Sequence, residues 1–255
     1  MGELLVDERQ VVVPGQVLAK GMDYLPNVGT YRKDENILAS RLGLVRLDGK
    51  VIKLIPLSGK YLPKVGDTII AKITDVTMSS WMAETNSAYT AMLNVKDATS
   101  QFIARGADLT RYFNFGDYIV TKIINVTSQK LVDLTMKGQG LRKLNGGRII
   151  AVEPSKVPRI VGKSGSMVNM IKHTTNCRVI VGQNGLIWLN GEPENELVAI
   201  EAIKKIEKES HISGLTERVQ QFLDDSKGRI VQSQNGTSSD DYNDSSQDNS
   251  DNKGE

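Results

Sequence analysis

The residues of this 255-residue chain best suited to chemistry form the tetrapeptide Gly162-Lys163-Ser164-Gly165. A glycine at each end lets the backbone turn tightly and approach a ligand without a Cβ in the way. The residues that follow are expected to open a helix, whose free N–H groups and positive dipole end favour an anion. Lys163 adds a mobile positive charge and Ser164 adds a hydroxyl donor. The loop is therefore suited to a phosphate group.

Two known loop types hold phosphates with residues of this kind. A nucleotide-binding P-loop needs Gly-x-x-x-x-Gly-Lys-Ser/Thr, but Val157 stands where its first glycine would be. The GxxG loop of a KH domain clamps a few nucleotides of single-stranded backbone, and it needs a helix on each side and strands beyond. A surface turn with two accidental glycines is the third alternative. The flanking residues decide among these alternatives.

The sequence around the loop predicts the element order of a KH domain. Apolar spacing and β-branched runs predict a strand over 148–152, helices over 155–161 and 166–174, strands over 177–181 and 186–189, and a helix from Pro193 onward. The glycines and asparagine of residues 182–185 predict a tight turn between the last two strands. This order resembles a eukaryotic-type (type I) KH domain across residues 146–210, within a domain placed at 141–212.

The middle of the chain, residues 61–140, alternates short strands with turns. Strands are predicted over 68–76, 81–84, 89–93, 118–126 and 131–136. Such a series predicts a small closed barrel. It resembles the S1-type OB-fold RNA-binding domain, and the resemblance is carried by Val65-Gly66-Asp67, Ala71-Lys72-Ile73-x-x-Val76, Gly116-Asp117-x-Ile119 and Asp133-Leu134-Thr135. The paired phenylalanines and histidine usual in that domain are not evident, and Trp81 falls where Gly-Phe is typical.

OB surfaces bind single strands by stacking bases on aromatic rings and by following the backbone with cations. The candidates for these roles in the barrel are Lys72, Trp81, Tyr89, Arg105, Arg111 and Lys122. Either aromatic side chain could instead belong to the barrel core or to a domain contact. Near the GxxG loop, Arg148 and Arg159 could extend a basic path, or they could be ordinary solvated charges. The apolar residues beside the loop, Ile160, Val161, Val168 and Ile171, are expected in the KH core.

The first sixty residues combine glycines, prolines and short β-rich runs, which predict another small β module. It contains no histidine or cysteine. No catalytic constellation is visible in it, so we expect residues 1–60 to hold the chain in place rather than to do chemistry.

Composition limits the function classes further. A single cysteine, Cys177, excludes an intramolecular disulfide and a cysteine-built zinc site, and with only two histidines no metal or other cofactor is expected. No stretch approaches the roughly 20 apolar residues of a membrane span, and the acidic N-terminus does not resemble a signal peptide. A soluble cytoplasmic protein is therefore expected.

The net charge of +2 conceals an asymmetry between the ends of the chain. Residues 231–255 carry six acidic residues and one lysine, a net charge of −5, which leaves +7 for residues 1–230. A moderately basic folded part is compatible with a polyanion partner. We expect a C-terminal helix over 213–231 and a disordered acidic tail over 232–255, which could solubilise the chain or act as a mobile interaction segment.

The three modules in this order resemble the S1/KH cap subunit of the archaeal RNA exosome over residues 8–212. Further residues that carry the resemblance are Val13-Pro14-Gly15, Gly29-Thr30-Tyr31, Lys137-Gly138-Gln139-Gly140-Leu141 and Leu144-Asn145-Gly146-Gly147. The predicted fold class is therefore multidomain, β-rich plus α+β, with a small N-terminal β domain, an S1-type barrel, a type I KH domain and the acidic tail.

The resemblance implies a non-catalytic role in RNA degradation. Three copies would cap a six-membered ring of RNase-PH-like subunits, alone or mixed with a second cap protein. The N-terminal module would dock on the ring and the barrels would line its pore. Single-stranded RNA would be passed to the ring for 3′-to-5′ degradation, with Gly162, Lys163, Ser164 and Gly165 clamping its backbone.

Two other function classes remain open on the sequence. A free-standing transcription or translation regulator would also use S1 and KH modules to bind single-stranded RNA. An enzyme is the third class, and it is not favoured because the sequence shows no paired carboxylates, no histidine-based triad and no metal cluster.

Overall fold

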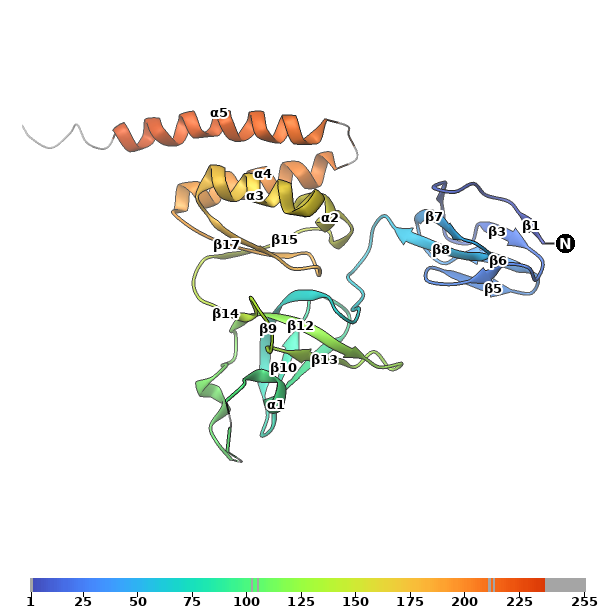
Figure 1. Cartoon of the computed structure of the whole chain (residues 1–255), viewed down its shortest axis with the longest axis horizontal. Helices are drawn as coiled ribbons and strands as arrows, with labels where there is room; N and C mark the ends of the chain where they lie inside the picture. The colour runs from blue at the N-terminus through green and yellow to red at the C-terminus, as the bar shows by residue number, and fades with distance from the viewer. Residues whose placement is uncertain (1, 102, 105, 211, 213, 237–255) are drawn as a thin grey trace, which may run out of the picture.

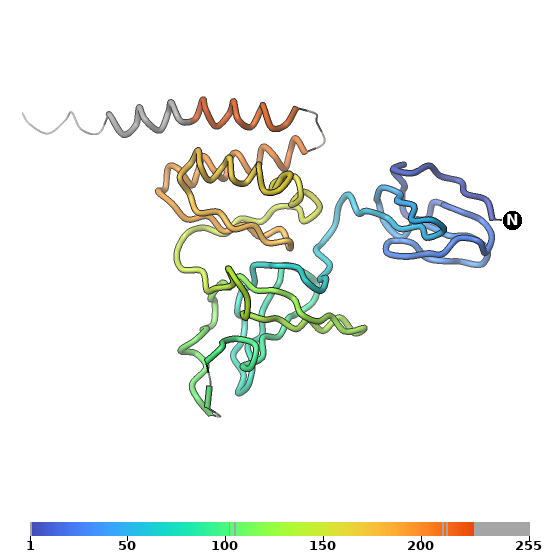
Figure 2. Tube along the Cα trace, in the orientation of Figure 1, coloured from blue at the N-terminus to red at the C-terminus, as the bar shows by residue number. Residues whose placement is uncertain are grey.

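The computed structural model describes residues 2–101, 103–104, 106–210, 212 and 214–236. They form three modules, and Figure 1 shows the N-terminal module to one side of a stack made by the other two. The tube in Figure 2 follows the chain from the N-terminal module through one extended connection into the barrel, and from the barrel into the KH domain. The predicted order of modules is confirmed.

The N-terminal module contains two four-stranded sheets, with the orders β1-β3-β6-β5 and β2-β7-β8-β4. The strands are β1 (Glu3–Leu4), β2 (Val11–Val12), β3 (Val17–Lys20), β4 (Leu25–Pro26), β5 (Thr30–Lys33), β6 (Asn36–Ala39), β7 (Gly43–Asp48) and β8 (Val51–Pro56). Alternate residues of a strand point to opposite faces, so β6 buries Ile37 and Ala39 while β8 buries Ile52 and Leu54 in the same core. The predicted small β module is confirmed.

The second module is a closed barrel. Its strands are β9 (Thr68–Val76), β10 (Ser80–Glu84), β11 (Thr90–Asn94), β12 (Tyr118–Val126) and β13 (Val132–Thr135). β9 pairs with both β10 and β12, and β13 closes the barrel between β11 and β12. The inward residues of β9, Ile69, Ala71 and Ile73, are buried in its core. Two short helices, α1 (Val95–Ala98) and η1 (Leu109–Arg111), lie between β11 and β12 in the chain.

One more strand, β14 (Arg142–Leu144), adds to the barrel by pairing antiparallel with β12. The sequence placed the start of the KH domain at residue 141, whereas the structure gives β14 to the barrel sheet. The physical reason is that Leu144 lies opposite Tyr118 in that pairing and packs into an apolar cluster with Ile70 and Val120. The KH sheet itself begins after Gly146 and Gly147.

The KH domain follows the predicted element order. Its elements are β15 (Arg148–Ala151), η2 (Pro154–Lys156), α2 (Val157–Val161), η3 (Lys163–Gly165), α3 (Ser166–Thr175), β16 (Arg178–Val181), β17 (Leu186–Asn190) and α4 (Pro193–Glu209). The sheet has the order β15-β17-β16, with both pairings antiparallel. Helices α2, α3 and α4 pack on one face of this sheet around Ile160, Ile171 and Ile203, which are fully buried.

The other face of the KH sheet rests on the barrel (Figure 1). The contact is apolar: Trp188 of β17 packs with Ile70 of β9, Val120 of β12 and Leu144 of β14. The backbone N–H of Gln183, in the turn between β16 and β17, donates to the carbonyl oxygen of Thr68 at 2.9 Å. Barrel and KH domain are therefore joined by both apolar packing and hydrogen bonds.

A last helix, α5 (Leu215–Gly236), lies across α3 and α4 as an outer layer. Leu215, Val219 and Leu223 repeat at helical spacing and pack into the KH core. The helix continues past residue 231, where the sequence predicted its end. The predicted disordered tail beyond Gly236 lies outside the described residues.

Candidate nucleic-acid interface

The GxxG loop connects α2 and α3 through an unusual backbone path. Gly162 adopts φ 74° and ψ 178°, a region that essentially only glycine occupies. Ser164 (φ 52°, ψ 29°) and Gly165 (φ 80°, ψ 9°) are both left-handed. The N–H of Gly165 donates to the carbonyl oxygen of Gly162 at 3.3 Å and closes the loop.

The two glycines are required for different reasons. A Cβ on Gly162 would lie 2.8 Å from both the backbone nitrogen and the Cβ of Met167, so no side chain fits there. A Cβ on Gly165 would meet no atom closer than 3.7 Å, so only its positive φ favours glycine. The loop can therefore sit directly on α3 at Gly162 while its outer end stays open.

The side chains that the loop offers are free to meet a ligand. Lys163, Ser164 and Arg159 are exposed, and Gly162 and Gly165 are partly exposed. Beside the loop lies a pocket of about 470 Å³ between the ends of α2 and α3 and the start of α5. Arg159 and Lys163 line it together with Glu217 of α5. Two cations and the N-terminal end of α3 make this region favourable for a phosphate.

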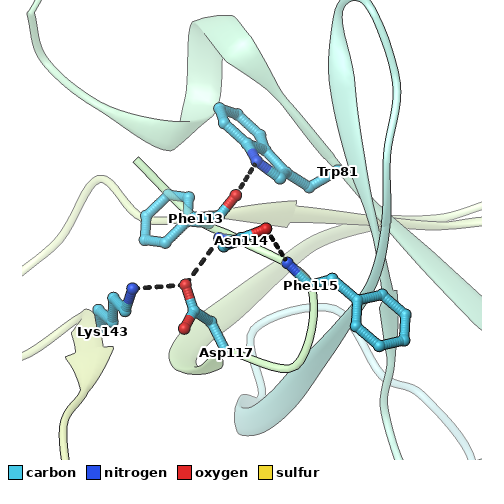
Figure 3. Close-up of polar contacts among 6 residues, drawn as sticks. All are labelled: Trp81, Phe113, Asn114, Phe115, Asp117 and Lys143. Atoms are coloured by element: carbon cyan, nitrogen blue, oxygen red, sulfur yellow. Dashed lines mark hydrogen bonds and ion pairs between the residues drawn. The ribbon is translucent and has the colours of Figure 1, made fainter. Parts of the chain in front are cut away.

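Trp81 does not offer a base-stacking surface, which corrects the prediction that it is an RNA-binding residue of the barrel. Its side chain is 0% exposed and packs edge-on against Phe113, with ring centroids 5.4 Å apart. Its Nε1 donates to the carbonyl oxygen of Phe113 at 2.8 Å (Figure 3). The indole satisfies its single donor inside the barrel, so it is a core residue.

The remaining barrel candidates are spread over the surface. Tyr89 is partly buried against the barrel core, and Lys122 is exposed on β12. Arg111 forms an ion pair with Asp108 at 3.6 Å. Hydrogen bonds from the hydroxyl and N–H of Thr110 lower the pKa of Asp108, which keeps that carboxylate charged beside Arg111. Arg105 lies outside the described residues.

Two cations are held by neighbours rather than free. The Nζ of Lys72 lies 5.9 Å from the centroid of the Tyr118 ring. Arg148 pairs through Nε with Glu196 at 3.0 Å, and the Glu196 side chain is only 8% exposed. Because Glu196 also accepts from the N–H of Gly191 at 3.0 Å, Arg148 helps to fix the start of α4. The Arg148 side chain is still 52% exposed, so part of it remains accessible to a ligand.

The structure therefore brings only some of the predicted site residues together. Arg159 lies beside the GxxG loop, on the helical side of the KH sheet. Lys72 and Lys122 lie on barrel strands, on the opposite side of that sheet. Any nucleic acid that met both groups would have to run around the edge of the KH domain.

Sequence reasoning missed Phe115 and Tyr118, of which Tyr118 packs against the apolar cluster between the barrel and the KH domain. Phe115 is 72% exposed, at the tip of the turn that precedes β12 (Figure 3). The pattern Asn-Phe-Gly-Asp is a usable signal, because a glycine at the third position favours a tight turn, and turns run over the protein surface.

Within the described residues, no group of three or more His, Cys, Asp or Glu side chains is placed to hold a metal ion. No helix of the described part is both long enough and apolar enough to cross a membrane.

Comparison with known proteins gives a consistent picture. The KH domain family matches residues 147–195. The exosome complex component Rrp4 of Pyrococcus horikoshii is 45% identical over 88% of this chain and 85% of its own length. The Rrp4 of Methanothermobacter thermautotrophicus is 43% identical over 87% of this chain and 70% of its own.

A solved crystal structure agrees with the sequence matches. It is described as an inferred exosome complex RNA-binding protein, shares 33% identity and superposes with a TM-score of 0.60 over 68% of this chain and 99% of its own. The relatives match the N-terminal module, the barrel and the KH domain together, not the KH domain alone. The chain therefore belongs to the Rrp4 family of exosome complex components.

Proposed function

We propose that this chain is a non-catalytic RNA-binding component of an archaeal exosome. It caps a six-membered ring of RNase-PH-like subunits in the cytoplasm and guides single-stranded RNA into the pore for 3′-to-5′ degradation. The observation that carries the proposal is the match to Rrp4 exosome components over all three modules. A free-standing RNA-binding regulator would not need the N-terminal module, the barrel and the KH domain in this order.

Each module has a task in this proposal. The N-terminal module docks on the ring, and three copies surround the pore, alone or mixed with a second cap protein. The barrel and the KH domain hold RNA. Since they are joined by the apolar cluster around Trp188, they present their binding residues as one rigid unit.

The GxxG loop is the proposed backbone clamp. Gly162 lets the chain turn against Met167, and Lys163 and Ser164 are left exposed to meet phosphate oxygens. Arg159, in the same pocket, adds a second cation. Such contacts act on the phosphates and are expected to be insensitive to base sequence.

Reconstitution tests the proposed function. The full chain is mixed with purified ring subunits of an archaeal exosome, and both complex formation and phosphate-dependent degradation of oligoadenylate are measured. We expect a stable complex that degrades RNA faster than the ring alone, and no degradation by the isolated chain. A chain that binds RNA but never joins the ring would favour the regulator, and nuclease activity of the isolated chain would show an enzyme.

The clamp itself is tested by the double substitution Lys163→Asp and Ser164→Asp in the full chain. RNA affinity should fall similarly for different base sequences, and the loss should shrink at high salt, where electrostatic attraction is screened. Lys204→Asp with Gln221→Asp, an exposed change on α4 and α5 outside the pocket with the same change in net charge, is the matched control. Equal losses in the two variants would mean that net charge, rather than the loop, decides affinity.

A further inference from the structure

A second pocket lies at the junction of the barrel and the KH domain, away from the GxxG loop. It measures about 450 Å³ and is lined by Gly116, Asp117, Tyr118, Leu144, Gly146, Gly147, Ile149 and Trp188. The barrel contributes the turn before β12 and the first residue of that strand, and the KH domain contributes β15 and β17. We call it the junction crevice.

The walls of the junction crevice are apolar and held in place. Tyr118 and Leu144 face it from the barrel, and Ile149 and Trp188 face it from the KH sheet. The indole of Trp188 is fixed because its Nε1 donates to the carbonyl oxygen of Gly146 at 2.8 Å. A flat group could lie against the partly exposed Tyr118 and Ile149 without first ordering them, which lowers the entropy cost of binding.

Part of the wall is bare backbone. Gly147 adopts φ 73°, and a Cβ there would lie 2.2 Å from the carbonyl oxygen of Leu189 and 3.0 Å from the Trp188 Nε1. No side chain can therefore cover the chain at this point. Backbone N–H and C=O groups in such a wall can hydrogen-bond the edge of a heterocyclic ring.

Phe115 directly precedes Gly116, a lining residue of the junction crevice, on a turn that is fixed from several sides. The N–H of Asp117 donates to the carbonyl oxygen of Asn114 at 3.1 Å, and the N–H of Asn114 donates back to Asp117 Oδ2 at 2.7 Å. The N–H of Gly116 donates to the carbonyl oxygen of Ile73 in β9 at 2.9 Å. Figure 3 shows Phe115 projecting away from this network. The backbone that carries the Phe115 ring is thus held in place, while the ring itself is 72% exposed.

The charged groups around the junction crevice are mostly paired, and one ammonium lies beside an aromatic ring. Its lining carboxylate, Asp117, is neutralised by Lys143, whose Nζ lies 2.5 Å from Asp117 Oδ2. The ammonium of Lys72 lies beside the Tyr118 ring, whereas Arg148, which begins the strand after Gly147, is paired with Glu196. Aromatic rings next to cations are the arrangement that single-stranded nucleic acids use on OB surfaces.

We propose that the junction crevice holds one nucleobase of single-stranded RNA against Tyr118, and that Phe115 stacks on a neighbouring base at the rim. This rests on the proposed RNA-binding function and adds a base-dependent site to the phosphate clamp at the GxxG loop. The two modules then share one RNA strand at their contact as well as at the loop.

The test compares Phe115→Ala with Leu131→Ala in the full chain. Leu131 is also exposed on the barrel, at 60%, but it belongs to the β12–β13 turn and not to the crevice. Binding of a fluorescein-labelled oligoadenylate is followed by anisotropy. Phe115→Ala should weaken it about tenfold, a typical loss for one stacked base, and Leu131→Ala should leave it unchanged. On an oligomer of abasic ribose phosphates, Phe115→Ala and wild type should bind alike.

Each other outcome overturns the inference. Equal affinity of Phe115→Ala and wild type for oligoadenylate would remove the stacking role while leaving the proposed function intact. An equal loss on the abasic oligomer would show a backbone contact instead of a base contact. If Phe115→Ala no longer joined the ring of exosome subunits but kept its RNA affinity, the surface around Phe115 would be a protein-docking surface. Wild type that joins the ring but binds no oligoadenylate would defeat the RNA-binding part of the proposed function as well.

Photocrosslinking gives an independent readout in the wild-type chain. An oligouridylate that carries 4-thiouridine is irradiated in complex with the protein, and the crosslinked peptides are identified by mass spectrometry. We expect crosslinks to residues 115–118 in addition to the region of the GxxG loop. Crosslinks confined to the loop region would contradict a base in the junction crevice.

Discussion

The side chain of Asn184, in a KH turn, bonds both backbone groups of Ile70 in barrel strand β9. Its Nδ2 donates to the Ile70 carbonyl oxygen at 2.7 Å, and its Oδ1 accepts from the Ile70 N–H at 3.3 Å. The same Nδ2 donates to the carbonyl oxygen of Thr85 at 2.9 Å. Asn184 is fully buried, and its side-chain amide pairs with the backbone of β9 as a neighbouring strand would. It explains why barrel and KH domain form one unit.

The substitution Asn184→Ala should weaken this unit more than any exposed change in the same turn. It leaves the backbone groups of Ile70 and the carbonyl of Thr85 buried without their partner, and each unsatisfied group costs roughly 1–3 kcal/mol. We expect a loss of about 3 kcal/mol in the free energy of unfolding, measured by urea titration. Gln183→Ala is the control, because the side chain of Gln183 is exposed and its docking bond uses the backbone N–H. Equal stability of the two variants would show that apolar packing alone holds the contact.

The two glycines of the GxxG loop should respond differently to alanine. Gly162→Ala meets both a forbidden backbone region and the 2.8 Å contacts with Met167, so a loss of about 3 kcal/mol or more is expected. Gly165→Ala faces open space and only the left-handed penalty of about 1–2 kcal/mol. Thermal unfolding measures both, and Gly165→Asn should recover part of the loss because asparagine tolerates that conformation. A Gly162→Ala variant as stable as wild type would contradict the loop geometry.

Local patterns in the sequence predicted most of the fold. The runs of β-branched residues over 68–76 and 118–126, each after a Gly-Asp turn, predicted β9 and β12 with the bounds that the structure shows. The glycines of the GxxG loop and the turn at 182–185 were recognisable because they need special backbone angles. These features depend on a few neighbouring residues, so the sequence displays them directly.

Features that depend on residues distant in the chain were not predictable in this way. Trp81 is buried because Phe113, far along the chain, supplies both a ring and an acceptor for its Nε1. The partner of Asn184 is Ile70, in a different module. Exposure of Phe115 likewise depends on how β9 and Asp117 hold its turn. Neither composition nor spacing contains these pairings.

The core position of Trp81 leads to a further prediction. Trp81→Phe removes the donor to the Phe113 carbonyl and part of the core volume, so the free energy of unfolding should fall by roughly 1–3 kcal/mol. RNA affinity per folded molecule should stay unchanged. Lys122→Gln should show the reverse pattern, because Lys122 is exposed: unchanged stability and weaker RNA binding at low salt. Circular dichroism measures unfolding, and anisotropy measures binding. A fully folded Trp81→Phe variant with much weaker RNA binding would show that Trp81 contributes to the RNA-binding surface.

The single cysteine offers a measure of how firmly the KH core is closed. Cys177 is 4% exposed, and burial raises the pKa of its thiol. The folded protein therefore favours the neutral thiol, which reacts poorly. At pH 8, iodoacetamide should leave the native chain unmodified for hours and alkylate the urea-unfolded chain quickly. Alkylation of native protein at the rate of a free thiol would show that the core opens readily.

The same shift in pKa predicts how stability depends on pH. An unfolded thiol ionises near pH 8.5, whereas the folded one keeps its proton to higher pH, so unfolding releases a proton in that range. The stability that Cys177 contributes should be fully present below about pH 8 and should decline as pH rises above it. Cys177→Ala removes this titration while the other groups still titrate. The difference in unfolding free energy between wild type and Cys177→Ala should therefore become less favourable to wild type between about pH 8 and 10. A difference that stayed constant over that interval would mean that the thiol has the same pKa in both states.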